Sequence, residues 1–197
     1  MKNPYSHALL LLAAGPLFCQ CSKAPDAAPK TDYRQAGITL MQQLTPQLTG
    51  TWDLRRVAVK RLTSSYYQKR AGVTKDTVFQ NFAILALAPA VASRYTPRDP
   101  QYGEFEGTLQ YAGKAFPVYF ALRVADEYAS TGQGPQAGFL FEFNYEPGSY
   151  PLDLDRQFLT DLGVVGDNFS LETTPGQPSM VWRGLNRGLD RIELQKR

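Results

Sequence analysis

Histidine and cysteine are almost missing from this chain of 197 residues. The sequence has one histidine, His7, and two cysteines, Cys19 and Cys21, and all three lie within the first 21 residues. The remaining residues therefore cannot supply Ser-His-Asp or Cys-His nucleophilic catalysis. They also lack the side chains for a His- or Cys-based zinc site and for an internal disulfide framework.

Strong charge and phosphate-binding patterns are also lacking. The formal net charge is only +3, and the densest basic stretch, Arg55–Arg61, is interrupted by two valines. Such a pattern is typical of a solvated strand face, so we do not expect nucleic-acid binding. The loop Gly132–Gly134 is not followed by a helix or by Lys-Ser/Thr, so it is not a phosphate-binding loop. No EF-hand spacing occurs.

The first 21 residues predict where the protein resides. A polar start containing Lys2 is followed by the apolar run Ala8–Phe18, which ends at Cys19 and Cys21. The run is too short to cross a bilayer as a helix but fits the apolar region of an export signal. The segment resembles bacterial lipoprotein signals. The resemblance implies a signal peptide at 1–20, lipid attachment at Cys21 rather than Cys19, and anchoring in the cell envelope to a bacterial membrane.

Two other interpretations of this segment remain open. It is also compatible with an ordinary secretory signal that contains two incidental cysteines, or with a short membrane anchor. Residues 21–34 are rich in Ala, Pro, Lys and Asp and have no apolar periodicity. Such a composition predicts a flexible tether. A single domain is then expected at 35–197.

The tether leads into a short predicted helix at Tyr33–Leu44, which Pro46 is expected to end. Beyond it, period-2 alternation predicts strands, and a phase change near Arg55 and Arg56 predicts a bulge. In one strand Phe139, Phe141, Phe143 and Tyr145 are expected to face inward. Eight or nine such strands predict an antiparallel all-β sandwich or barrel. The strands are expected at 51–63, 78–87, 102–111, 118–125, 139–146, 162–165, 168–172, 180–183 and 191–195.

The tripeptide Gly50-Thr51-Trp52, which opens the first strand after the helix, favours a barrel. Gly-x-Trp at this position resembles the lipocalin and lipocalin-like families. The resemblance implies an antiparallel lipocalin-like β-barrel of about eight strands with a short N-terminal helix. Gly50 would then let the chain enter the barrel floor tightly, and Trp52 would plug it. An arginine of the last strands, Arg191 in preference to Arg183 or Arg187, would lie over the indole. The alternative is a tryptophan that merely begins a strand.

Carboxylates remain as candidate catalytic groups. Glu104 and Glu106 share one strand face, as do Asp153 and Asp155, and an i, i+2 spacing of about 7 Å is compatible with glycoside chemistry. However, Glu104 and Glu106 flank a phenylalanine, as on any half-solvated strand. Asp153 and Asp155 together with Asp161 lack a defined calcium loop. We therefore expect no metal and no cofactor.

These observations predict a non-catalytic, membrane-tethered lipoprotein that binds a small apolar or amphipathic ligand. The 11 phenylalanines and 11 tyrosines provide apolar side chains for a core or a cavity. The first alternative is an envelope protein-interaction module with a filled barrel, and the second is a histidine-free enzyme that uses carboxylates. An internal cavity of roughly 300–1,000 Å³ would favour ligand binding, and a filled interior would favour the interaction module.

Overall fold

The computed structural model describes residues 32–94, 97–146, 148–149 and 151–197, which belong to one compact unit. The expected signal peptide, most of the expected tether and both cysteines lie outside the described residues. The described strands are β1 (Gly50–Val59), β2 (Thr77–Pro89), β3 (Tyr102–Tyr111), β4 (Lys114–Val124), β5 (Ala137–Phe143), β6 (Asp167–Thr173), β7 (Ser179–Gly184) and β8 (Leu189–Lys196). The described helices are α1 (Tyr33–Leu48), α2 (Tyr66–Arg70), α3 (Asp126–Thr131) and α4 (Leu154–Leu162).

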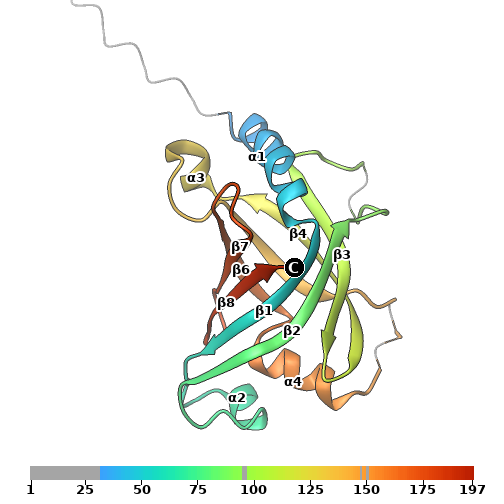
Figure 1. Cartoon of the computed structure of the whole chain (residues 1–197), viewed down its shortest axis with the longest axis vertical. Coiled ribbons are helices and arrows are strands. Elements are labelled where there is room, and N and C mark those ends of the chain that lie inside the picture. The colour runs from blue at the N-terminus through green and yellow to red at the C-terminus, as the bar shows by residue number, and fades with distance from the viewer. Residues whose placement is uncertain (1–31, 95–96, 147, 150) are drawn as a thin grey trace, which may run out of the picture. The chain divides into compact units, whose positions relative to one another are not determined.

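The eight strands form a closed antiparallel barrel (Figure 1). Each strand pairs with the next in sequence, and β8 returns to pair with β1. Closure leaves no free sheet edge, so the backbone of every strand has a neighbour on both sides. The predicted fold class, an antiparallel barrel of about eight strands preceded by a short helix, is confirmed.

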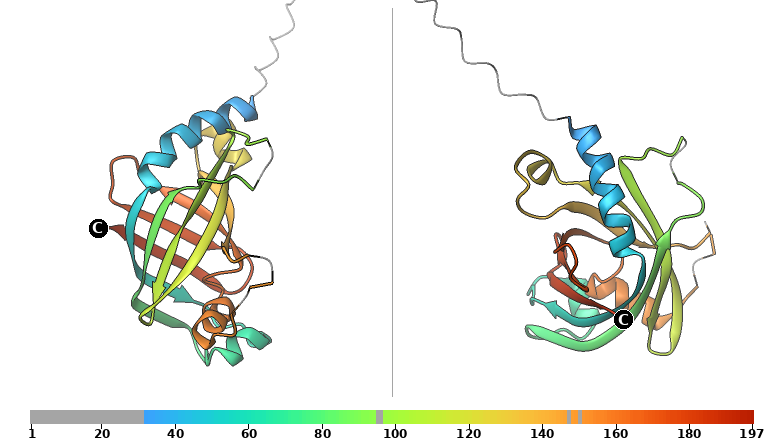
Figure 2. Two further views of the ribbon diagram at one scale, coloured as in Figure 1. Left: turned by 90° about the vertical axis from the view of Figure 1, so that its right-hand side faces the viewer. Right: turned by 45° about the horizontal axis from the view of Figure 1, so that its top comes forward.

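Helix α1 is longer than the sequence pattern indicated. Asp32 caps its N-terminus by accepting a hydrogen bond from the Gln35 backbone nitrogen at 3.0 Å. The helix then continues through Pro46 to Leu48, so the prediction that Pro46 ends it is wrong. A proline in the last turn removes only one backbone donor. Burial of Leu44 and Leu48, both at most 2% exposed, outweighs that loss. Figure 2 shows α1 lying across one end of the barrel.

The predicted bulge in the first strand is confirmed. The pairing of β1 with both of its neighbours shifts between Leu54 and Arg56. The extra residue brings Val57 and Val59 onto the same buried face as Trp52 and Leu54.

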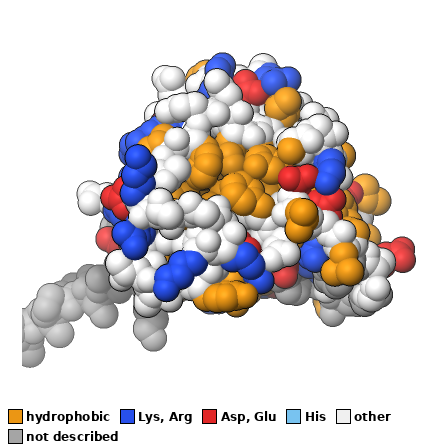
Figure 3. All heavy atoms as spheres, turned by 90° about the horizontal axis from the view of Figure 1, so that it is seen from below, with side chains coloured by type: hydrophobic (Ala, Val, Ile, Leu, Met, Phe, Trp, Pro, Cys, Tyr) orange, Lys and Arg blue, Asp and Glu red, His pale blue; other side chains and the backbone are white. Residues whose placement is uncertain are grey.

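The end of the barrel opposite α1 carries α2 and α4 (Figures 1 and 2). The sequence pattern predicted a strand at 162–165, which is wrong because the segment contains the end of α4 and its exit turn. Asp153 caps α4, and Gly163 ends it with a φ of +81°. The helix buries Leu159 and Leu162 completely, and it closes part of the barrel mouth with them. Figure 3 views the molecule from this side and shows hydrophobic side chains gathered in its centre, with charged ones around them.

Candidate functional site

The predicted floor motif lies at the α1 end of the barrel. Trp52 is 3% exposed, and its Nε1 donates a hydrogen bond to the Leu48 carbonyl at 2.8 Å, which ties the first strand to the last turn of α1. Gly50 has a φ of +129°, a conformation that other residues rarely adopt. A Cβ there would lie 3.0 Å from Lys196 Cε. The sequence therefore needs glycine where the chain turns from helix to strand.

The cation over Trp52 is Lys196, and the choice of Arg191 was wrong. Lys196 Nζ lies 5.3 Å from the indole centroid and donates to the Gln47 carbonyl at 3.0 Å. Arg191 lies opposite Ala58 of β1 and reaches Glu193 at 3.0 Å. The strand register explains why Lys196, and not Arg191, covers the indole, because Lys196 is the residue of β8 that pairs with Trp52.

The two alternative arginines also lie elsewhere. Arg183 pairs with Glu172 on the neighbouring strand. Arg187 lies over Tyr67, at the opposite end of the barrel from the indole.

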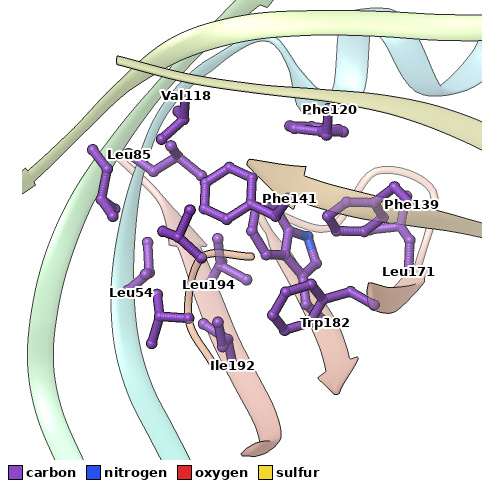
Figure 4. Close-up of a cluster of buried hydrophobic side chains, with 14 of the residues drawn as sticks. Leu54, Leu85, Val118, Phe120, Phe139, Phe141, Leu171, Trp182, Ile192 and Leu194 are labelled. Carbon is purple, nitrogen blue, oxygen red and sulfur yellow. The ribbon is translucent and has the colours of Figure 1, made fainter. Parts of the chain in front are cut away.

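Large apolar side chains pack together inside the barrel. Trp182 is fully buried, and its ring centroid lies 4.9–5.8 Å from those of Phe120, Phe139 and Phe141. The expected inward orientation is confirmed for Phe139 and Phe141, whereas Tyr145 lies beyond the end of β5. Figure 4 shows this packing, and each labelled residue is at most 6% exposed. The residues labelled there are Leu54, Leu85, Val118, Phe120, Phe139, Phe141, Leu171, Trp182, Ile192 and Leu194.

Two of the larger hollows lie on the outside of the barrel wall. One, of about 720 Å³, is lined by Asn81, Gln110 and Lys114 among others. The other, of about 800 Å³, is lined by Arg123, Asn168 and further residues of the β4–β6 wall. Both are open rather than enclosed, so neither is the internal cavity that a buried ligand would need.

A group of partly exposed aromatic side chains lies at the α4 end, and we call Phe79, Phe82, Tyr111 and Phe158 the aromatic mouth. Their ring centroids form a chain of contacts, with Phe82 4.9 Å from Tyr111 and Tyr111 stacked on Phe158 at 5.9 Å. Burial raises the pKa of Tyr111, and the nearby charge of Asp155 adds to the shift. At the mouth, aromatic side chains extend from the core to a surface that carries charge.

The aspartates near the mouth are held by cations. Lys114 Nζ lies 2.7 Å from both Asp153 and Asp155. The hydrogen bond from Lys114 lowers the pKa of Asp153. Asp161 is buried and accepts two hydrogen bonds of 2.5 Å from the Arg70 guanidinium. Across the described ranges, no three Asp, Glu, His or Cys side chains form a group that would hold a metal ion.

The burial of Glu104 shows that its predicted place on a solvated strand face is wrong. Its side chain is only 2% exposed because the loop after β2 covers it. Burial alone would raise its pKa, but hydrogen bonds from Ser93 Oγ, from Tyr119 Oη at 2.5 Å and from the Arg94 backbone nitrogen at 2.8 Å together lower it. The carboxylate fixes the loop to the outer wall, and nothing in the alternation of β3 distinguishes it from Glu106.

The chain matches no protein-family model, and searches of curated proteins and of solved structures gave no match either. Within the part of the chain that the structure describes, no helix is both long enough and apolar enough to cross a membrane. Cys21, the expected lipid attachment site, lies outside that part.

Proposed function

We propose that this chain is a non-catalytic, membrane-tethered envelope protein whose filled, lipocalin-like barrel acts as a rigid scaffold and binds through its surface. The observation that carries the proposal is the packing of Phe120, Phe139 and Phe141 around Trp182, which occupies the space that an internal ligand would need. A densely packed interior resists opening, because every displaced ring loses its contacts.

Native mass spectrometry of the full chain, purified in mild detergent, tests the filled scaffold. We expect a mass that equals the processed chain with its N-terminal lipid and nothing else. A further bound small molecule that survives gentle activation would reveal a ligand site inside the barrel or at the aromatic mouth, and the scaffold proposal would fail.

The tether rests on the lipoprotein-like N-terminus. Two or three acyl chains give firm anchoring, at about 0.8 kcal/mol for each buried CH₂ group. Cys21→Ala should release the protein from the membrane fraction or leave it unprocessed, and the matched variant Cys19→Ala should change neither property. Lipid that is retained in Cys21→Ala but lost in Cys19→Ala would assign the modification to the other cysteine.

A second candidate function is binding of a small apolar or amphipathic ligand at the aromatic mouth. The observation that favours it is that Phe79, Phe82, Tyr111 and Phe158 are only partly buried although they join the core. Titration with an anilinonaphthalene sulfonate probe tests this candidate. The Phe158→Ser variant should weaken probe binding, and Tyr128→Ser, which removes a partly buried aromatic residue on α3, should not. Equal probe binding by both variants would remove the candidate.

A further inference from the structure

Exposed apolar side chains concentrate on two short segments at the α2 and α4 end. Of the ten large apolar residues that the described ranges leave exposed, five are Leu62, Tyr66, Tyr67, Leu152 and Leu154. Leu152 is fully exposed and Leu154 is 83% exposed. We call these five residues, together with the cations Arg61 and Lys69, the α2–α4 face. Apolar groups gathered at one place on a surface indicate an interaction site more than single scattered ones do.

The two parts of this face are joined. Arg70 of α2 ion-pairs with the buried Asp161 of α4 at 2.5 Å. A hollow of about 470 Å³ is lined by Arg70 of α2, by Leu152 and Leu154, and by further residues of α4. The two segments thus form one continuous surface.

The exposed tyrosines are held in place. The Arg70 guanidinium lies 5.3 Å from the Tyr66 ring centroid, and Arg187 lies 5.2 Å from that of Tyr67. The buried Gln68 fixes the loop, because its amide donates to the Lys60 carbonyl at 2.8 Å and accepts from the Leu62 nitrogen at 2.6 Å. A face that is already ordered loses little conformational entropy when it binds.

The α2 half of this face is positively charged. The segment 60–76 contains five Lys or Arg residues and one Asp. Arg61 and Lys69 are exposed, and among the described residues neither forms an ion pair. The carboxylates beside this face each contact a cation: Asp161 binds Arg70, Asp190 binds Lys60 at 2.7 Å, and Asp153 and Asp155 share Lys114. An anionic partner would therefore meet uncompensated cations.

We propose that the α2–α4 face binds an anionic phospholipid surface. Tyr66, Tyr67, Leu152 and Leu154 enter the headgroup boundary, where tyrosine and leucine are favoured, while Arg61 and Lys69 contact lipid phosphates. The inference deepens the proposed surface-binding role and rests on it.

The shape of the face favours a bilayer over an acidic peptide. Leu152 and Leu154 are almost wholly exposed although they border the hollow beside Arg70, whereas a peptide-binding groove encloses the side chains that line it. The closed barrel has no free strand edge at this end. A bilayer accepts protruding side chains without a preformed complementary pocket.

Vesicle capture by the full chain tests the inference. The full chain carrying Cys21→Ala, which has no acyl chains to enter a bilayer, is immobilised on beads through a C-terminal biotin tag and is mixed with dye-labelled vesicles. One set is phosphatidylcholine alone, and the other contains about 30 mol% phosphatidylglycerol, enough to give a strongly negative surface. We expect capture of the anionic vesicles and little capture of the neutral ones. Equal capture of both sets, or capture of neither, would overturn the inference.

Matched variants assign the capture to the face. Lys69→Glu should lower anionic capture at least about fivefold, which is the effect of roughly one lost basic contact, while Arg123→Glu on β4 should leave it unchanged. Leu152→Ser with Leu154→Ser should lower it strongly, and the exposed pair Val91→Ser with Leu140→Ser should not. Capture that persists in both face variants would belong to the N-terminal apolar run and would contradict the inference. A ligand found by mass spectrometry would remove the scaffold proposal instead, whatever the vesicles show.

Discussion

At the end covered by α1, the apolar side chains lie inside. Leu44 and Leu48 of the helix and Trp52 of the floor are each at most 3% exposed, and Lys196 over the indole already has a carbonyl partner. At the end that carries α2 and α4, Tyr66 and Leu154 are 66% and 83% exposed. Both ends are fixed by hydrogen bonds, so the contrast does not come from one end being looser than the other.

The difference in burial separates apolar residues that stabilise the fold from apolar residues that lie on the surface. Burial of a large apolar side chain contributes about 1.5–3 kcal/mol, so the residues of the α1 end stabilise the barrel. Exposed tyrosines and leucines contribute little to stability. Their concentration on an ordered surface therefore points to binding. The predictions below test this separation, from the largest expected effect to the smallest.

The largest effect is expected between the two ends, in the hydrophobic core of the barrel. Phe141→Asp should unfold the domain, because Phe141 is fully buried and its replacement would place an unpaired carboxylate beside Trp182. Its neighbour Leu140 is 40% exposed, so Leu140→Asp serves as the control and should remain folded. Circular dichroism of the two variants distinguishes them. A folded Phe141→Asp protein would mean that the barrel interior contains a large hydrated cavity.

The second-largest effect is expected at the α1 end. Trp52→Ala should lower the free energy of unfolding by about 3–5 kcal/mol, the usual effect of emptying a large buried aromatic site. Tyr66→Ala at the other end should change it by less than about 0.5 kcal/mol. Urea denaturation followed by circular dichroism measures both. Similar losses at the two ends would abolish the contrast between them.

Glu104 predicts a pH-dependent contribution. Its folded pKa is lowered from the ordinary value of 4.5, so the unfolded state binds the proton more readily than the folded state does. The stabilisation is therefore present above about pH 4.5 and is lost as the pH falls through the folded pKa. Glu104→Gln should lower the free energy of unfolding by about 1–3 kcal/mol at neutral pH. It should also reduce the loss of stability that the unmodified chain shows on acidification. Glu106→Gln, on the same strand, should do neither. If Glu104→Gln lost as much stability on acidification as the unmodified chain, the Glu104 carboxylate would not hold the loop.

Local patterning predicted much of the fold. The alternation in β3, β4 and β5 and the phase change at Arg55 follow from the two-residue period of a strand, which is readable without the structure. The helix α4 was missed although its signals are present, namely Asp153 as N-cap, apolar residues at helical spacing and Gly163 at the C-terminus.

Contacts between residues far apart in the sequence could not be predicted from local patterns. The position of Lys196 over Trp52 depends on the register of β1 against β8, which two irregularities set. The burial of Glu104 depends on a loop that folds back from β2. The α2–α4 face joins residues that are about 85 positions apart in the sequence, and only the folded barrel brings them together.

The most direct test of the contrast measures stability and vesicle capture on one protein, the full chain carrying Leu152→Ser and Leu154→Ser. The account predicts a free energy of unfolding within about 0.5 kcal/mol of the unmodified chain, together with loss of anionic vesicle capture. A clear fall in stability with capture unchanged would contradict it, because these leucines would then serve the fold and not a partner.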